Sequence, residues 1–358
     1  MMRTMRSIAA VVLAGFFLAL VAVPAEAQQL PKVRYMLSSQ KGTTHYPATL
    51  AEHLGFFKEE GFDIEVLPGP GSGGMIRQVI AKQVDIGQGS PGAILMAMQA
   101  GNKLKGVYTI FYKDVFPMVT LGDSKVRRVE DLKGSALGIS EFSGGEVAIA
   151  RGVLARAGLA EGKDVNLLPV GETPASALQA LRSGRVGAYM SGFQDIVALR
   201  YKEPSLREIV IPQTSKFQSQ IVVMRQDSFE QNRKLAVALS RGLAKATLFA
   251  HTNPAAAQAL LAKVAPAEYV DPKFGRLFLD TVLDLTRPPA DALAKGEFGR
   301  NHVEAWEAYQ AFLITGKKAA EGGLEKPQDL QGFLTNELIG EINAFDKERI
   351  RKMAREYK

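Results

Sequence analysis

Short apolar segments alternate with amphipathic stretches through the first two thirds of the chain. The apolar segments are short enough for strands, and the stretches after them carry apolar residues at helical spacing. The expected strands are Lys32–Ser38, Phe62–Leu67, Val84–Gly87, Lys105–Tyr112, Ala136–Ser140, Ile209–Ile211 and Gln220–Met224. The expected helices include Ala48–Phe57, Met75–Lys82, Ala93–Ala100 and Glu146–Ala157. Strands alternating with helices of about a dozen residues predict a mainly parallel α/β architecture.

The pattern changes after Asp227, where only helical spacing remains. Leu235–Ala250 and Val303–Leu313 each carry apolar residues on one face, which predicts packed helices. Asn253-Pro254 and Asp271-Pro272 are typical of helix starts. We therefore expect the last part of the chain to be helical.

One stretch of the pattern occurs twice. Residues 66–94 and 167–196 each contain an apolar run ending in Leu-Pro, a turn-rich loop, a helical stretch and a second apolar run that closes on Gly and Ser. Pro68 matches Pro169, and Val84 matches Val186. The repeat predicts two similar lobes, each presenting a loop and a helix N-terminus. Two such lobes facing each other form a clamp, which favours a small-molecule binder over an enzyme.

The repeat and the helical region together suggest a division of the chain. We expect lobe one to comprise residues 28–115 and 220–300, and lobe two to comprise residues 116–219 with the crossover strands. The crossings are expected near residues 116–121 and 218–224. The helices of residues 301–358 are expected to brace the back of lobe one.

The amino-terminal residues have the features of a secretory signal peptide. Arg3 and Arg6 precede an apolar run over residues 8–23, and Ala25-Glu26-Ala27 is an A-x-A cleavage site. Cleavage of residues 1–27 would leave a mature chain starting at Gln28 in the periplasm. The alternative is an uncleaved anchor, but the run is shorter than the roughly 20 residues that a membrane span needs.

Composition excludes several chemistries. The chain has no Cys, which rules out disulfides, thiolate metal sites and a Cys nucleophile. The formal charge is +7, but the basic residues are dispersed except in the tail Lys347–Lys358. A nucleic-acid binder would show a basic stripe with interleaved aromatic residues, so we expect no nucleic-acid partner. We also expect no cofactor and no metal.

Three motifs resemble those of one known family. Residues 51–61 (AEHLGFFKEEG) resemble a signature of the periplasmic substrate-binding proteins of ABC importers, in the subgroup for nitrate, sulfonates, taurine, bicarbonate and thiamine precursors. Residues 131–140 (DLKGSALGIS) and 181–188 (LRSGRVGA) resemble two more of its motifs, although Gly187 replaces the usual Asp that Asp85 keeps in the first copy. The resemblance covers about residues 31–340. It implies a two-lobed type II fold with two crossing strands as the hinge, and an inner-membrane permease as partner.

Ligands of open α/β sheets lie beyond the carboxyl ends of the strands. The loops expected there are Ser38–His45, Pro70–Gly74, Gly87–Pro91, Ser140–Gly145, Gly171–Thr173 and Ser191–Asp195. Within them, small and polar residues can bring backbone N–H groups and hydroxyls to a ligand. The candidates of this kind are Ser39, Ser72, Gly73, Gly74, Gly89, Ser90, Ser143, Gly144, Thr173, Ser191 and Gly192. Ordinary turn and cap chemistry is the alternative for Ser72, Gly73, Gly74, Ser143 and Gly144.

Five larger side chains are further candidates. Thr44, His45 and Tyr46 follow the first strand in a loop that lines the cleft of the resembled family, which makes His45 the best polar ligand contact. The alternative for His45 is a surface histidine beside a helix start. Phe142 and Phe193 could close over an apolar part of the ligand, with core packing as the alternative.

The charge of these loops bears on the ligand. They contain no Arg, so a bidentate clamp for a doubly charged anion is absent from them. Glu141, Glu146 and Asp195 lie nearby and would oppose a strongly anionic ligand. We therefore expect a singly charged or largely neutral organic ligand.

These expectations combine into a monomeric periplasmic solute receptor that closes by hinge bending, delivers its ligand to a permease and has no catalytic activity. One alternative is an enzyme of the thiamine-pyrimidine-synthase type on the same fold. That group relies on a Cys-rich motif and a metal, and it belongs in the cytoplasm. The other alternative is a ligand-loaded partner of a membrane sensor, which shares both the fold and the binding chemistry with a transport receptor.

Overall fold

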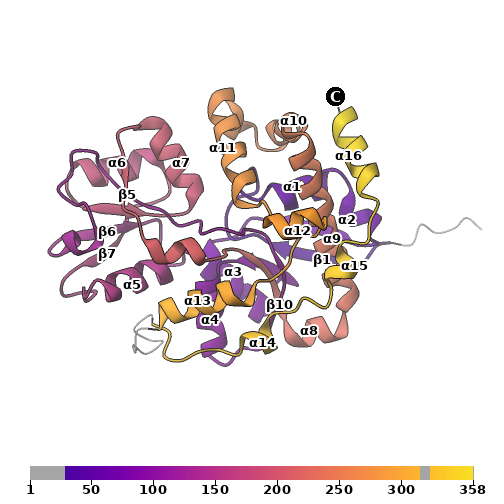
Figure 1. Ribbon diagram of the computed structural model, residues 1–358, viewed down its shortest axis with the longest axis horizontal. Coiled ribbons are helices and arrows are strands. Elements are labelled where there is room, and N and C mark those ends of the chain that lie inside the picture. Colours follow the sequence, from indigo (N-terminus) through magenta and orange to yellow (C-terminus); the bar gives the residue numbers. More distant parts are fainter. Residues whose placement is uncertain (1–28, 315–322, 358) are drawn as a thin grey trace, which may run out of the picture.

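The chain forms two five-stranded sheets with helices packed around each (Figure 1). The computed structural model describes residues 29–314 and 323–357. The expected signal peptide of residues 1–27 and its cleavage point lie outside the described residues. Within the described part, no helix is both long and apolar enough to cross a membrane.

The first sheet has the strand order β2-β1-β3-β10-β4. Its strands are β1 (Lys32–Met36), β2 (Asp63–Leu67), β3 (Ile86–Gly89), β4 (Leu104–Thr109) and β10 (Ile221–Arg225). Strand β1 pairs in parallel with β2 and β3, whereas β10 is antiparallel to β3 and β4. Every residue of β3 is buried, and so are the first four of β10, as expected for strands at the centre of a covered sheet.

The second sheet repeats this layout in the order β7-β6-β8-β5-β9. Its strands are β5 (Met118–Thr120), β6 (Ala136–Ile139), β7 (Asn166–Pro169), β8 (Ala188–Met190) and β9 (Arg207–Glu208). Strand β6 is parallel to β7 and β8, and β5 is antiparallel to β8 and β9. The expected strand at Ile209–Ile211 therefore lies earlier, at Arg207–Glu208.

The chain passes between the sheets twice, after β4 and after β9. The first strand after each passage, β5 or β10, is the strand that pairs antiparallel with its neighbours. The expected two-lobed α/β fold with two crossing strands and a helical carboxyl-terminal region is confirmed.

Helix α9 (Arg233–Thr252) is the main support of the first lobe and contacts α1, α2, α10, α15 and α16. The other helices on this side are α1 (Tyr46–His53), α2 (Phe56–Glu59), α3 (Gly71–Ile80), α4 (Pro91–Gln99), α8 (Gln226–Gln231), α10 (Pro254–Val264), α11 (Pro272–Leu285) and α12 (Ala290–Ala294). A single helix was expected at Ala48–Phe57. It is divided because Gly55 adopts a left-handed conformation with φ 75°, which ends one helix and starts the next.

Side-chain caps fix the starts of several helices. The carboxyl-terminal half contains Asn232, Asn253 and Asp271, whose side-chain oxygens accept backbone N–H groups of α9, α10 and α11. Proline follows directly in α10 and α11, where its missing N–H costs nothing. The cap signals seen in the sequence therefore act as expected.

The second lobe is built from fewer helices, at the left of Figure 1. They are α5 (Val147–Arg156), α6 (Pro174–Arg182) and α7 (Phe193–Lys202), with the short 3-10 turns η1 (Val129–Leu132) and η2 (Pro212–Lys216); η3 (Pro266–Tyr269) precedes α11. A small apolar cluster including Tyr189 and Leu199 fills the outer part of this lobe. The larger apolar cluster continues from the first lobe into the second, because β6, α5 and Phe193 belong to it.

The last helices contact both lobes. They are α13 (Val303–Leu313), α14 (Leu330–Phe333), α15 (Ile339–Ile342) and α16 (Lys347–Glu356). Helices α15 and α16 pack on α9, while α13 lies against both α4 and α5. The tail thus packs on α9 of the first lobe, and α13 also reaches the second.

A second contact between the lobes is aromatic. Phe193 of α7 packs on Phe278 of α11 with ring centroids 6.0 Å apart, and Tyr201 packs on Phe274 at 5.3 Å. The Tyr201 hydroxyl also donates a hydrogen bond of 2.7 Å to Asp271 Oδ2. Helices α7 and α11 therefore hold the two lobes against each other beside the crossing strands.

Candidate functional site

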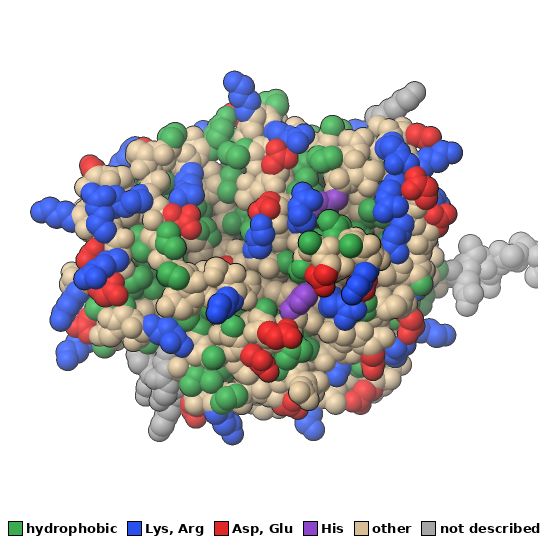
Figure 2. Space-filling view, viewed as in Figure 1, with side chains coloured by type: hydrophobic (Ala, Val, Ile, Leu, Met, Phe, Trp, Pro, Cys, Tyr) green, Lys and Arg blue, Asp and Glu red, His purple; other side chains and the backbone are tan. Residues whose placement is uncertain are grey.

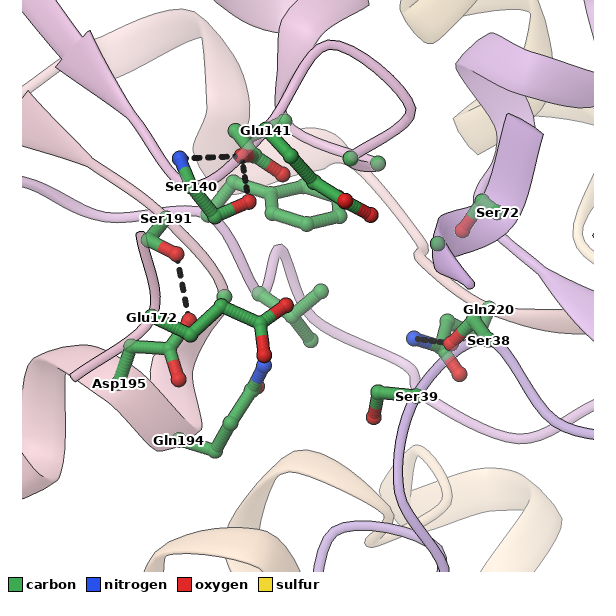
Figure 3. A pocket seen from close by; sticks show the side chains of 17 residues that line it. Ser38, Ser39, Ser72, Ser140, Glu141, Glu172, Ser191, Gln194, Asp195 and Gln220 are labelled. Atoms are coloured by element: carbon green, nitrogen blue, oxygen red, sulfur yellow. Dashed lines mark hydrogen bonds between the residues drawn. The ribbon is translucent and has the colours of Figure 1, made fainter. Parts of the chain in front are cut away.

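A polar pocket lies between the lobes, where parallel strands of both sheets end (Figure 3). The first lobe supplies Ser38, Ser39, Gly71, Ser72 and Gln220, and the crossing segment supplies Val115 and Phe116. The second lobe supplies Ser140, Glu141, Gly144, Gly145, Glu146, Glu172, Ser191, Gly192, Gln194 and Asp195. The cavity between these residues has a volume of about 30 Å³, and the space free of protein atoms rises to about 420 Å³ when the mouth open to solvent is included. The position is the one expected for a ligand of parallel α/β sheets.

A chain of hydrogen bonds supports the first-lobe wall from behind. The Gln88 amide donates to His45 Nδ1 at 2.9 Å and to Gln220 Oε1 at 2.6 Å, while its oxygen accepts from the Tyr35 hydroxyl. His45 Nδ1 is therefore an acceptor, and the ring hydrogen is on Nε2, which donates to Ser39 Oγ at 2.9 Å. Complete burial lowers the pKa of His45 to about 3, so the ring is neutral.

The three serines of this wall have their oxygens already engaged. Ser38 Oγ accepts from Gln220 Nε2 at 2.9 Å, Ser39 Oγ accepts from His45, and Ser72 Oγ accepts from the Ser90 N–H at 3.1 Å. Among the described residues, none of the three hydroxyl hydrogens has an acceptor. Each hydroxyl is therefore free to donate to a ligand in the pocket.

Helix α3 begins at this wall with a glycine-rich turn. The sequence placed the glycines in a loop before the helix, but the helix starts at Gly71 and includes them. Gly71 has φ 74°, and a Cβ atom there would lie 2.4 Å from the Ser143 carbonyl oxygen of the second lobe. The Gly73 N–H donates to the same oxygen at 3.1 Å. Glycine is needed here because the backbones of the two lobes meet.

The second-lobe wall is acidic (Figure 3). Glu146 is almost completely buried, and its Oε1 accepts from both the backbone N–H and the hydroxyl of Ser140. Asp195 Oδ2 accepts from the Ser191 hydroxyl at 2.5 Å. Glu141 accepts from the Ser143 hydroxyl at 2.6 Å, and Glu172 lies at the exposed rim.

Burial and mutual repulsion raise the pKa values of Asp195, Glu146 and Glu172. Desolvation, opposed by the Ser191 hydrogen bond and assisted by Glu172 and Glu146, raises the pKa of Asp195 to about 8. Desolvation also raises the pKa of Glu146 and of Glu172. Within the described residues, no Lys or Arg lines the pocket or forms an ion pair with any of its four acids.

The structure brings some of the sequence candidates to the pocket surface and leaves others behind it. Those that line the pocket are Ser39, Ser72, Gly144, Ser191 and Gly192. Those directly behind the lining are His45, Gly73, Gly89, Ser90 and Ser143, each of which contacts a lining residue. Gly74 lies one position further along α3, against Pro70.

The remaining candidates lie elsewhere. Thr44 and Tyr46 are buried, and the Tyr46 hydroxyl bonds to Thr286. Thr173 is the N-cap of α6, and Phe142 is 57% exposed outside the lining. Phe193 packs in the core between Phe111 and Phe278, as its alternative assignment proposed.

Several lining residues were not among the candidates. Ser38, Ser140, Glu172, Gln194 and Asp195 belong to or adjoin the expected loops, so position after a strand was the signal for them. Glu141 and Glu146 were noticed only as charges nearby. Val115, Phe116 and Gln220 come from the crossing segments, and only the pairing of β5 and β10 places those segments at the pocket floor.

Metal ions in proteins are held by groups of side chains such as His, Asp and Glu. Among residues 29–314 and 323–357, no group of three or more His, Asp or Glu side chains is arranged to hold a metal ion. The acids of the pocket instead take hydrogen bonds from serine hydroxyls.

Comparison with known families agrees with this geometry. A sequence profile described as "NMT1/THI5 like" matches residues 42–257, which include both copies of the repeat. The chain belongs to the NMT1/THI5-like family. The match covers strands of both sheets and every lining residue except Ser38 and Ser39. No curated protein matches the chain.

Solved structures share the fold of this family member. The alkanesulfonate-binding protein SsuA of Xanthomonas axonopodis pv. citri, bound to MOPS, has a TM-score of 0.65 and 18% identity over 86% of this chain and 99% of its own. The periplasmic aliphatic sulphonate-binding protein SsuA of Escherichia coli has a TM-score of 0.58 and 18% identity, covering 81% and 95%. A Cys-to-Ser mutant of DszB in complex with biphenyl-2-sulfinic acid has a TM-score of 0.54 and 16% identity, covering 88% and 99%. These likenesses show the periplasmic-binding-protein fold.

Proposed function

We propose that the chain is a periplasmic solute receptor, which captures a small organic molecule between its lobes and delivers it to an ABC-type import permease. The observation that carries the proposal is the pocket itself. It is lined from both lobes and the crossing segment, at the ends of parallel strands, by groups suited to hydrogen bonding. Closure of two lobes over such a pocket would bury most of a small ligand.

The location and partners follow from the same proposal. Residues 1–27 would direct export and be removed, leaving a soluble chain free to shuttle to the membrane. The receptor would act as a monomer, because one copy would present both lobes to one permease. Acidic and basic side chains are mixed over the face shown in Figure 2, and neither charge forms a separate patch there.

The direction of the hydrogen bond between His45 and Ser39 favours a binding role for Ser39 over nucleophilic catalysis. A serine nucleophile needs a histidine that can take its proton. Here His45 donates its Nε2 hydrogen to Ser39, because Gln88 occupies Nδ1 as a donor. The arrangement makes Ser39 a better hydrogen-bond donor to a ligand and a poor nucleophile.

The proposal is tested with the mature chain, residues 28–358, purified from the periplasm. Native mass spectrometry of the purified protein looks for a bound solute, and thermal unfolding is followed with a library of amines, amides, carboxylates, sulfonates and pyrimidines. A specific ligand at about 100 times its Kd should stabilise the fold by about 2.7 kcal/mol.

Two results would count against a receptor. One is the absence of any bound or stabilising solute. The other is turnover of a stabilising solute by the purified protein, which would favour the enzymatic alternative. Cell fractionation and the mass of the mature amino terminus test the location separately.

A further inference from the structure

The two walls of the pocket have opposite hydrogen-bonding character. The first-lobe wall presents three hydroxyls, from Ser38, Ser39 and Ser72, whose hydrogens are free to donate, because each oxygen already accepts a hydrogen bond from a protein group. Ser38 is 6% exposed and Ser72 is 2% exposed, so bulk water is a poor substitute for a ligand acceptor. The amino-terminal turn of α3 lies on the same side and also favours an acceptor.

The second-lobe wall presents acceptors instead. Its serines, Ser140 and Ser191, donate to Glu146 and Asp195 rather than into the pocket. For each of these two carboxylates one oxygen takes the serine hydroxyl, and the other has no hydrogen-bonding side chain among the described residues. Glu141 and Glu172 add two more acids at the rim.

No cation of the protein balances this wall. Two described bases close to these acids in sequence are engaged elsewhere: Arg151 pairs with Glu161 and Arg200 with Glu208. Arg77 lies near Gly73 beside the pocket, but within the described residues it forms no ion pair with the four acids. Unpaired carboxylates in a poorly hydrated pocket are costly, and without a counter-charge they retain a proton, as the raised pKa of Asp195 indicates. A cationic ligand would supply the counter-charge and favour the ionised form.

We propose that the ligand is a small organic cation, an ammonium or amidinium, with a neutral hydrogen-bond acceptor at its other end. The cationic end would lie against Glu146 and Asp195. The acceptor end would lie against Ser38, Ser39 and Ser72, which face Asp195 across the pocket (Figure 3). Val115 and Phe116 would contact the apolar part between the ends. This inference rests on the proposed receptor function and names the substrate class of the same site.

A sulfonate or nitrate would fit this pocket poorly. Its oxygens could accept from the first-lobe serines, but its charge would face Glu146 and Asp195 without a compensating Lys or Arg in the lining. The chain therefore shares the fold of the sulfonate-binding proteins, while its own pocket lining contains four acids and no Lys or Arg.

The test uses two sets of probes that keep their shape and differ in charge. The aromatic set is benzamidine, benzamide and benzenesulfonate, and the aliphatic set is β-alaninamide, butyramide and propanesulfonate. Binding to the mature chain is measured by calorimetry at pH 8.5, where more of the Asp195 carboxyl is ionised. We expect a cation to bind at least 10-fold more tightly than its neutral analogue, and the sulfonates to bind more weakly still.

Isosteric variants assign the effect to the acids. Asp195→Asn and Glu146→Gln should each weaken cation binding by roughly 10- to 100-fold, the range for loss of one charge-assisted hydrogen bond. They should leave binding of the neutral analogues nearly unchanged. The matched control is Glu356→Gln, since Glu356 is exposed on α16 at the far end of the chain. If one of these two variants fails to fold, the other still tests the role of the acids.

The outcomes separate the two proposals. Preference for a sulfonate, or equal binding of cation and neutral analogue, would overturn the inferred charge and leave the receptor function standing. Failure of both cations to bind, while another solute of the library does, would also overturn it. If no solute binds at all, the proposed receptor function is contradicted, and the inferred ligand class is contradicted with it.

Discussion

His45 shows how one buried side chain can order a binding wall without touching the ligand. It is completely buried, accepts from Gln88 and donates to Ser39, so its ring is neutral and fixed in one tautomer. Because the folded protein resists protonation of this ring, the unfolded chain binds the extra proton first as the pH falls. Stability should therefore decrease with falling pH below the unfolded pKa of about 6.5.

We expect His45 to cost the protein about 2 kcal/mol of stability between pH 7 and pH 5, since its folded pKa is about 3. His45→Gln keeps an amide donor and acceptor and should remove this part of the pH dependence. The measurement is urea unfolding at both pH values. His53→Gln is the control, because His53 is exposed; an equal effect in both variants would contradict the assignment.

Asp195 has the opposite dependence. Its folded pKa of about 8 lies above the unfolded value, so the folded state holds a proton that the unfolded chain loses from about pH 4 upwards. Stability of the empty protein should fall as the pH rises from 4 to 8. Asp195→Asn should remove this loss and stabilise the empty protein at pH 8 by roughly 1 kcal/mol or more, seen as a Tm increase of about 2 °C. A lower Tm at pH 8 would show that the carboxylate is paired.

The sequence predicted where polar residues would gather, but not which of them would face the ligand space. Loops after parallel strands were identified because strand ends are recognisable from the apolar pattern. His45 lies behind Ser39, and Phe193 lies in the core, because side-chain direction depends on contacts with Gln88, Phe111 and Phe278, which are distant in sequence. Gln220 reaches the pocket only through the pairing of β10 with β3.

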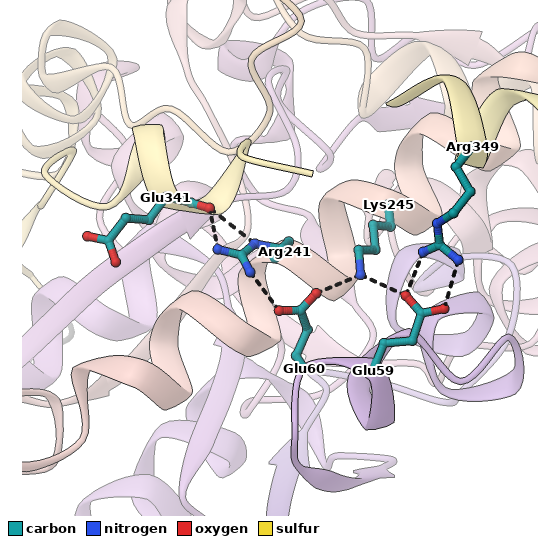
Figure 4. A network of polar contacts seen from close by, with 6 residues as sticks. All are labelled: Glu59, Glu60, Arg241, Lys245, Glu341 and Arg349. Carbon is teal, nitrogen blue, oxygen red and sulfur yellow. Dashed lines mark hydrogen bonds and ion pairs between the residues drawn. The ribbon is translucent and has the colours of Figure 1, made fainter. Parts of the chain in front are cut away.

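At the scale of elements, a polar network joins α2, α9, α15 and α16, and it includes the Glu341 carbonyl of α15, which accepts from Arg241 (Figure 4). Lys245 of α9 is 5% exposed and pairs at 2.8 Å with Glu59, the last residue of α2, and at 2.6 Å with Glu60, which caps it. Arg241 of α9 pairs with Glu60, and Arg349 of α16 pairs with Glu59. The network fixes α2 and the final helix on the same face of α9.

Lys245 should contribute most of this network's stability because its charge is buried between two partners. We expect Lys245→Met to destabilise the fold by about 2–4 kcal/mol, because it leaves two acids partly unpaired. Arg349→Met should cost only about 0.5 kcal/mol, since that side chain is half exposed. Lys58→Met, at an exposed pair with Asp63, is the control in the same denaturation experiment. Equal costs for Lys245 and Lys58 would contradict the assigned role.

Element boundaries were predictable where a local signal exists. Asn and Asp caps followed by Pro marked α10 and α11 correctly. The start of α3 was misplaced because glycine disfavours helix. Glycine is required at this helix start by the Ser143 carbonyl, and Ser143 is too distant in sequence for a local pattern to show the contact.

At the scale of the whole molecule, the backbones of the lobes meet at Gly71. Gly71→Ala would place a methyl group against the Ser143 carbonyl, so we expect the lobes to move apart and ligand affinity to fall by about 10-fold or more. Small-angle scattering should show a larger radius of gyration. Gly61→Ala is the matched control: Gly61 has φ 85°, and a Cβ atom there would meet nothing within 4 Å. An unchanged radius in the Gly71 variant would contradict this role.

The internal repeat was sufficient to predict the two lobes, because duplicated strands must build duplicated sheets. It could not predict how tightly the lobes are joined. Helix α13 lies against both α4 and α5, and α7 packs on α11, through contacts between residues that no local pattern relates.

The aromatic contact between α7 and α11 has a kinetic consequence. Phe193, Tyr201, Phe274 and Phe278 join the two lobes across this contact. If these rings must separate before a solute enters, the observed association rate should rise with solute concentration and level off at the opening rate. The strength of this contact would determine how fast the receptor loads, independently of how tightly it holds its cargo.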